Sequence, residues 1–93
     1  MIEHLLWTDE NEAKLAAHSI SRSEVVQMVA SLNYIMFESP YSSQVRVTGY
    51  TLANRWLTIA MEEYGEGVFR PITGWIATRR ERERFARAEQ GLE

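Results

Sequence analysis

The spacing of apolar positions changes along the chain and separates helical segments from strands. Between residues 22 and 32 the apolar side chains recur three and four positions apart, which is typical of a helix with one face against a core. These side chains are Val25, Val26, Met28, Val29 and Leu32. From about residue 34, polar and apolar positions tend to alternate, and aromatic and β-branched residues become common. That second pattern predicts strands.

Three segments carry the signature of a helix N-terminus, in which Ser, Thr or Asp is followed three positions later by Glu. The pairs are Asp9 with Glu12, Ser21 with Glu24, and Thr78 with Glu81. They predict helices over about 9–18, 22–32 and 79–89. The last segment has few apolar side chains besides Phe85, so most of its surface is expected to face solvent.

Strands are predicted at 34–38, 45–52, 56–63 and 68–77. Short loops join the last three, which indicates antiparallel hairpins. Asn54 is expected in a left-handed conformation in the first of these loops, because Asn tolerates a positive φ better than most residues. Pro71 has no backbone donor, so the last strand is expected at an edge of the sheet.

The order α-α-β-β-β-β-α predicts one α+β domain over residues 1–93, with two N-terminal helices, a four-stranded antiparallel sheet and a C-terminal helix. Residues 91–93 are expected to be a disordered tail or a cloning remnant. No charged leader and no apolar run of about 18–20 residues is present, so we expect a cytoplasmic protein without a membrane partner.

The chain has no cysteine and only two histidines, which are fourteen residues apart in the sequence. The lack of cysteine excludes disulfides, a thiol nucleophile and a thiolate metal site. No phosphate-binding loop, dinucleotide-binding turn or metalloprotease motif is present. We therefore expect neither a metal nor a cofactor.

The net charge is −3, yet nine of the ten basic residues are arginine and six of these arginines follow Gly67. The planar guanidinium suits phosphate and carboxylate groups, which favours an anionic partner. The acidic overall balance counts against broad nucleic-acid binding. Composition therefore leaves the partner open.

Arginine, lysine and histidine are the residues here that could support RNA cleavage without a metal, which needs a base, an acid and a cation near the phosphate. Arg55 opens a strand and is a candidate cation, and the hairpin could bring Arg46 near it. His18, with a reference pKa near ~6.5, is the candidate general acid or base. Lys14 lies four residues earlier, on the same helix face.

Each candidate also has a purely structural interpretation. Strand arginines commonly cover a solvent-facing surface with their stems, and a histidine at a helix end often complements the helix dipole. The alternating Arg/Glu run over 79–84 is typical of a salt-bridged solvated face, although Arg80, Arg84 and Arg87 also form a basic stripe. Tryptophans more often serve as core or interface residues than as platforms for bases. The three are Trp7, Trp56 and Trp75.

Six short motifs follow one another over roughly residues 5–85. They are Trp7-Thr8-Asp9-Glu10, His18-Ser19-Ile20-Ser21, Val47-Thr48-Gly49-Tyr50-Thr51, Asn54-Arg55-Trp56-Leu57-Thr58-Ile59, Ile72-Thr73-Gly74-Trp75 and Ala77-Thr78-Arg79-Arg80-Glu81-Arg82. In this order they resemble the BrnT toxin family. The resemblance implies a RelE-like ribonuclease toxin of a type II toxin–antitoxin system, which cleaves RNA without a metal and is neutralised by a cognate antitoxin. It also implies that Arg55, at the family's hairpin arginine, belongs to the active site.

The sequence departs from the family pattern at four positions. Ser19 and Asn54 stand where the family has glycine, Trp75 stands where it has the arginine that ends the last strand, and Phe85 stands where it has a tyrosine. Arg46 or Arg70 is a candidate replacement for the missing cation. A weak or context-dependent endoribonuclease is therefore expected.

Two functions of different classes follow from these observations. In the first, the chain is a BrnT-like toxin in which Arg55 stabilises the phosphate, His18 or Lys14 transfers a proton, and other arginines contact RNA. Those arginines are Arg46, Arg70, Arg80 and Arg84. In the alternative, a catalytically degenerate member binds a protein through Trp56, Trp75 and the arginine-rich C-terminal helix, or binds RNA without cleaving it. The expected partners are an antitoxin, RNA and a second copy of the chain.

Overall fold

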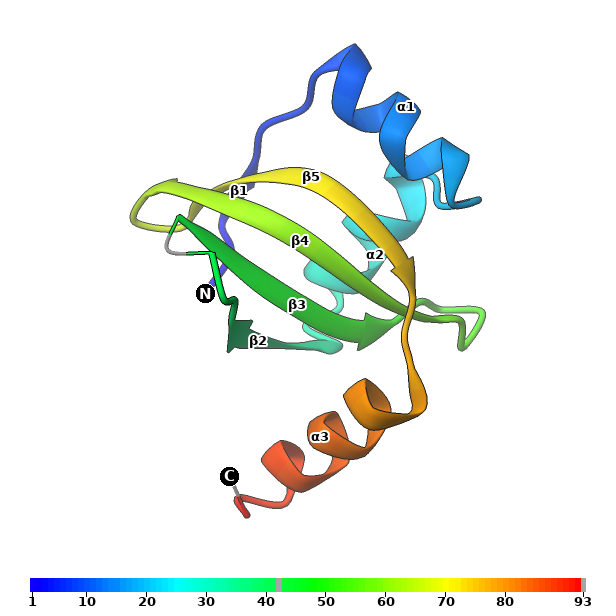
Figure 1. Ribbon diagram of the computed structural model, residues 1–93, viewed down its shortest axis with the longest axis vertical. Helices are drawn as coiled ribbons and strands as arrows, with labels where there is room; N and C mark the ends of the chain where they lie inside the picture. The colour runs from blue at the N-terminus through cyan, green and yellow to red at the C-terminus, as the bar shows by residue number, and fades with distance from the viewer. Residues whose placement is uncertain (42, 93) are drawn as a thin grey trace.

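A twisted five-stranded sheet forms the middle of the protein, with α1 and α2 on one face and α3 on the other (Figure 1). The computed structural model describes residues 1–41 and 43–92. Its elements in chain order are β1 (His4–Leu5), α1 (Asp9–Ala17), α2 (Arg22–Ala30), β2 (Tyr34–Glu38), β3 (Gln44–Tyr50), β4 (Trp56–Gly65), β5 (Val68–Ile76) and α3 (Arg79–Glu89). The expected α+β class is confirmed.

The sheet differs from the expected four antiparallel strands, because the order is β1-β5-β4-β3-β2. Strands β2 to β5 pair in antiparallel fashion, but β1 pairs in parallel with β5. In that pairing His4 lies opposite Val68 and Leu5 lies opposite Phe69. A strand of two residues is too short to show alternation, and its partner is more than sixty residues away in the sequence. The sequence pattern therefore could not reveal it.

Pro71 was expected to place β5 at an edge of the sheet, and this was wrong, since β5 lies between β1 and β4. The missing donor is tolerated for two local reasons. Strand β1 reaches only as far as Phe69, so it does not pair with Pro71. On the other side, Pro71 lies opposite Met61, where the register shifts by a bulge that interrupts the ladder.

The helix termini follow the capping signals closely. Ser21 with Glu24 and Thr78 with Glu81 form the two reciprocal capping boxes that the sequence predicts. The N-cap of α1 lies one residue earlier than the sequence signature predicts. This cap is Thr8, whose hydroxyl accepts from the backbone N–H of Asn11 at 3.1 Å, so the expected pair of Asp9 and Glu12 was wrong.

Helix α2 buries a narrower stripe than its sequence predicts. Val25 and Met28 are fully buried, whereas Val26 and Leu32 are exposed. The helix ends at Ala30, and Leu32 takes a left-handed conformation with φ of 57°. Leu32 therefore belongs to the turn into β2 and not to the helix face.

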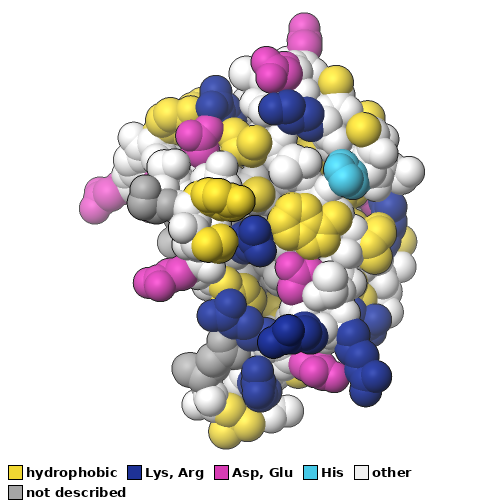
Figure 2. All heavy atoms as spheres, viewed as in Figure 1, with side chains coloured by type: hydrophobic (Ala, Val, Ile, Leu, Met, Phe, Trp, Pro, Cys, Tyr) yellow, Lys and Arg dark blue, Asp and Glu magenta, His cyan; other side chains and the backbone are white. Residues whose placement is uncertain are grey.

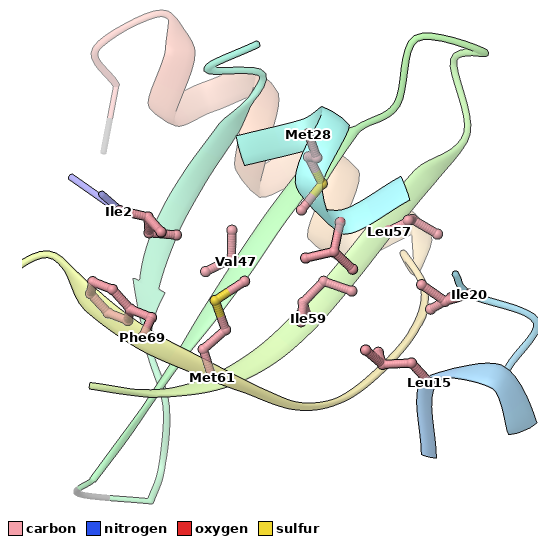
Figure 3. Close-up of a cluster of buried hydrophobic side chains, with 10 residues drawn as sticks. Ile2, Leu15, Ile20, Met28, Val47, Leu57, Ile59, Met61 and Phe69 are labelled. Atoms are coloured by element: carbon pink, nitrogen blue, oxygen red, sulfur yellow. The ribbon is translucent and has the colours of Figure 1, made fainter. Parts of the chain in front are cut away.

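The core lies between the sheet and the first two helices (Figure 3). Cross-strand pairs such as Val47 with Ile59 point to this side, because alternate residues of a strand point to opposite faces. The buried cluster consists of Ile2, Leu15, Ile20, Val25, Met28, Val47, Leu57, Ile59, Met61 and Phe69. No helix in the described parts of the chain is both long and apolar enough to cross a bilayer.

Candidate nucleic-acid interface

The opposite face of the sheet, which we call the α3 face, carries aromatic and basic side chains beneath α3. Register places Arg46, Thr48 and Tyr50 of β3 on this face, across from Ala60, Thr58 and Trp56 of β4. Thr48 and Thr58 are buried and share a hydroxyl hydrogen bond of 2.9 Å. The mutual hydrogen bond satisfies two hydroxyl groups that are covered by the surrounding side chains.

Helix α3 docks on this face through one buried side chain. Phe85 packs edge-on against Trp56, with ring centroids 4.9 Å apart, and against Tyr50 at 6.0 Å. It is the only residue of α3 that is buried. The remaining side chains of the helix therefore lie along its flanks or face solvent.

Trp75 fixes the beginning of α3. Its indole Nε1–H donates to the Glu81 carboxylate at 3.1 Å. The same carboxylate accepts from the backbone N–H of Thr78 at 2.8 Å, which closes the capping box. One carboxylate thus joins β5 to the first turn of α3, and this contact sets where the arginines of the helix lie.

A pocket of about 320 Å³, which we call the basic pocket, lies between α3 and strands β2 and β3. It is lined by Phe37, Glu38, Pro40, Arg46, Thr48, Arg80, Glu81, Arg84 and Arg87. Four arginines against two glutamates make it locally positive, although the whole chain is acidic. Figure 2 shows Lys and Arg side chains gathered over α3 and the adjoining sheet. Such a pocket suits an anion with several oxygens.

Aromatic rings hold two of these guanidinium groups. The Cζ atom of Arg46 lies 5.3 Å from the ring centroid of Trp75, and that of Arg84 lies 4.3 Å from the centroid of Phe37. Cation–π contacts of this kind orient a planar cation without neutralising its charge. The Nε atom of Arg46 is also buried and has no hydrogen-bond partner among the described residues, so any anion in the pocket would meet the other atoms of this guanidinium.

The structure brings together three of the four arginines expected to bind RNA, since Arg46, Arg80 and Arg84 all line the basic pocket. Arg70 lies on the same face but outside this pocket. Its guanidinium donates to Glu62 and lies 5.2 Å over the ring of Tyr64. The hydrogen bond to Glu62 raises the pKa of Arg70 above its usual value. Trp75 borders the basic pocket through Arg46, and Trp56 lies on the other flank of α3.

Arg55 lies on the α1–α2 side of the sheet, where one of its guanidinium nitrogens is bound. Its Nη1 donates to both carboxylate oxygens of Glu24 at 2.8 Å and to the backbone carbonyl of Ser19 at 2.6 Å. Arg46 and Arg55 are therefore not neighbours, contrary to the expectation from the hairpin. Arg46 pairs with Ala60, far along β4 from Arg55, and faces the other side of the sheet.

His18 and Lys14 lie near the same junction of α1 and α2. His18 is the C-cap of α1 and directly precedes Ser19, whose carbonyl accepts from Arg55. Lys14 is half exposed and forms an ion pair with Glu10 at 3.4 Å. Arg55 and His18 thus lie at the C-terminal end of α1, and none of the three residues expected to be catalytic lines the basic pocket.

The ion pair with Arg55 controls the acidity of Glu24. Burial by itself raises the pKa of this carboxyl, but hydrogen bonds from Arg55 and from the Ser21 backbone, with the charge of Arg55, outweigh burial. The pKa of Glu24 therefore lies below its ordinary value of 4.5. Since the folded-state pKa is the lower one, Glu24 stabilises the fold above about pH 4.5. This stabilisation disappears as the pH falls through the folded-state pKa.

We expect Glu24→Gln to lower the free energy of unfolding by about 1–2 kcal/mol at neutral pH and by much less near pH 3. Glutamine can still complete the capping box, so the substitution isolates the charge. Urea denaturation at both pH values measures the effect. Glu12→Gln is the control, because its contact with Arg22 is long, at 3.7 Å, and exposed. An equal loss in both variants would contradict a special role for the Arg55–Glu24 pair.

Several residues of this face had no sequence signal of their own. Phe37, Tyr50 and Arg82 become part of it only through strand register and the docking of α3. Alternation within β2 and β3 could have indicated which residues share a face, but not which strands are neighbours. Within residues 1–41 and 43–92 no group of three or more His, Asp or Glu side chains is arranged to hold a metal ion.

The chain matches no protein-family model and no curated protein. Its function must therefore be inferred from the arrangement of its side chains and from the motifs of its sequence.

Proposed function

We propose that the protein binds RNA through the α3 face, with phosphate groups held in the basic pocket. The observation that carries the proposal is the convergence of Arg46 from β3 with Arg80, Arg84 and Arg87 from α3. Strand and helix supply these cations from distant parts of the sequence, so the pocket is not a by-product of one charged helix. The resemblance of the sequence motifs to BrnT toxins favours RNA over other polyanions.

Binding without cleavage at this pocket has support from its composition. Among the described residues that line it there is no histidine, lysine or tyrosine, and its two carboxylates are Glu38 and Glu81, of which Glu81 already accepts from Trp75 and Thr78. RNA cleavage without a metal is efficient with groups that exchange protons near neutral pH, and arginine does not release its proton. The basic pocket is therefore proposed as a binding site for the RNA backbone.

The resemblance supports a second proposal, that the chain is the toxin component of a toxin–antitoxin pair. Trp75 stands where the BrnT family has an arginine, and the guanidinium of Arg46 lies against its ring. Arg46 is thus well placed to act as the cation at that position. The catalytic roles of Arg55, His18 and Lys14 stay predictions, to be tested in cells.

The binding proposal predicts that the double variant Arg80→Gln/Arg87→Gln weakens binding of a short fluorescent single-stranded RNA by about tenfold at ~0.1 M salt. The slope of log affinity against log salt should become shallower by roughly 1.4, since each phosphate contact in a single strand contributes about 0.7. Both side chains are exposed, so the fold should be retained. Fluorescence anisotropy over a salt series gives both quantities.

The matched comparison is Arg80→Gln against Arg22→Gln, since each removes one positive charge and the second removes it from the α1–α2 side. Arg22→Gln should leave the affinity and the salt slope close to those of the unmodified protein. If Arg22→Gln weakens binding as much as Arg80→Gln, RNA is attracted by general charge, and the proposal for the basic pocket is wrong.

The toxin proposal predicts that induced expression arrests growth, and that Arg46→Ala relieves the arrest. Arg55→Ala and Glu24→Gln break the same ion pair, but only the first removes the cation. Growth is measured for each variant, and total RNA is examined for cleavage. Relief of the arrest by Arg55→Ala and not by Glu24→Gln would establish a direct role for Arg55. Relief by both variants would indicate that the Arg55–Glu24 ion pair only stabilises the fold. Normal growth with the unmodified protein would favour the non-enzymatic module.

A further inference from the structure

A second pocket lies on the other flank of α3 from the basic pocket. It has a volume of about 820 Å³ and is open to solvent. Three aromatic rings meet in it, since Tyr50 lies 4.9 Å from Trp56 and both contact Phe85. Tyr50 and Trp56 are only partly buried, so ring surface remains accessible there. We call this hollow the aromatic pocket.

The charge of the aromatic pocket differs from that of the basic pocket. Arg79 and Arg82 line it together with Glu83 and Glu89, so its formal charges balance. The Nε atom of Arg79 is 3.0 Å from the carboxylate of Glu83, so this arginine already faces an opposite charge. A phosphate would gain little here, whereas a flat and uncharged group would find rings to stack on.

Arg82 adds a planar cation to the rings. Its Cζ atom lies 5.3 Å from the ring centroid of Trp56. Arginine planes and aromatic side chains are the surfaces on which proteins stack unpaired bases. The aromatic pocket contains both kinds of surface within one hollow.

Asn54 supplies a polar group at the rim of the aromatic pocket. Its φ of 61° holds it in the turn before β4, where its backbone N–H donates to the carbonyl of Thr51 at 2.9 Å. The backbone is thereby fixed, while the exposed side-chain amide has no hydrogen bond to any described residue. An amide can donate and accept at once, which matches the edge of a nucleobase.

The two pockets adjoin across α3. Consecutive residues at the start of this helix separate them, because Arg79 lines the aromatic pocket and Arg80 lines the basic pocket. An α-helix with its side chains is only about 10–12 Å wide. A single strand of a few nucleotides could therefore cross the first turn of α3 and reach both pockets.

We propose that the aromatic pocket binds an unpaired nucleobase of an RNA strand whose phosphates occupy the basic pocket. The ligand is then single-stranded RNA, since a base inside a duplex could not reach Tyr50 and Trp56. This inference rests on the proposed RNA binding and adds the class of RNA and a base subsite. Its residues are Tyr50, Asn54, Trp56 and Arg82.

The test uses protein labelled with 5-fluorotryptophan, whose fluorine resonances report separately on Trp7, Trp56 and Trp75. Two probes are compared, an oligouridylate and an abasic ribose-phosphate oligomer of the same length. The oligouridylate should shift the resonances of Trp56 and Trp75, whereas the abasic oligomer should shift only that of Trp75. Trp7 lies on the α1–α2 side beside Arg22 and should not move.

The affinities of two variants for these oligomers complete the test. Asn54→Gly removes the amide but tolerates the positive φ, so the turn is retained. It should weaken oligouridylate binding by about three- to tenfold and leave abasic binding unchanged. Trp56→Leu should weaken oligouridylate binding by about tenfold or more, as loss of a stacking ring does.

The outcomes separate the two proposals. If both oligomers bind and shift Trp75 but affect Trp56 equally or not at all, the base subsite is wrong and the basic pocket stands. An unchanged oligouridylate affinity in Asn54→Gly and Trp56→Leu would overturn the base subsite in the same way. If neither oligomer binds, the proposed RNA binding fails, and the base subsite fails with it.

Discussion

Replacing Gly49 with alanine is expected to abolish stable folding or to lower the free energy of unfolding by more than about 4 kcal/mol. A Cβ atom at this position would lie 2.0 Å from the carbonyl oxygen of Asn33 and 2.9 Å from the Cα of Tyr34. Both are backbone atoms at the start of β2, so no side-chain rotation relieves the overlap. The Asn33 carbonyl also accepts from the Tyr50 N–H at 3.0 Å, and this bond would be disrupted.

This loss is a large part of the ~5–15 kcal/mol that stabilises a typical domain. Urea denaturation followed by far-ultraviolet circular dichroism measures it. Gly65→Ala is the control, because a Cβ there has no neighbour within 4 Å and any cost comes from local backbone conformation. If the two variants are equally stable, the close approach of β2 and β3 at Gly49 is wrong.

Phe85→Ala is the second substitution with a large expected effect, and its effect falls on the site. Loss of a buried phenylalanine typically costs about 3–5 kcal/mol. Because Phe85 is the only buried residue of α3, this cost falls on the docking of the helix and not on the core. We expect α3 to leave the sheet while the rest of the domain stays folded. Both pockets would then lose their helical wall.

Hydrogen exchange and RNA binding together measure this outcome. The amides of α3 should exchange faster in Phe85→Ala, and RNA affinity should fall at least about tenfold. Phe69→Ala removes the same ring from the core cluster, where the side chain is 2% exposed. That control should lower global stability without selectively releasing α3. Unchanged RNA affinity in folded Phe85→Ala would show that the α3 face does not bind RNA.

The two faces of the sheet thus have different roles. On one face α1 and α2 cover the hydrophobic core, and on the other α3 completes two pockets. The separation explains how an acidic protein can hold a locally positive site. The acidic residues are spread over the chain, whereas four arginines line one pocket. Local potential, and not net charge, decides whether an anion is bound there.

The sequence by itself determined the elements other than β1, and several of their ends. Helices α2 and α3 begin where the Ser21 and Thr78 signatures place them, because a capping box forms between residues only three positions apart. Asn54 takes the left-handed conformation expected of it, with φ of 61°, for an equally local reason. The stripe of arginines on α3 was also visible, since helical periodicity alone defines it.

Only the tertiary structure decided which of these elements meet. Arg55 is bound by Glu24, thirty-one positions away in the sequence, and Arg46 lies against Trp75 on the other face. The parallel pairing of β1 with β5 likewise joins segments that are far apart in the sequence. Capping and periodicity act over a few residues, whereas these contacts depend on strand order, register and the docking of α3. Arg46 and Arg55 therefore came to lie on opposite sides of the sheet only when the chain folded.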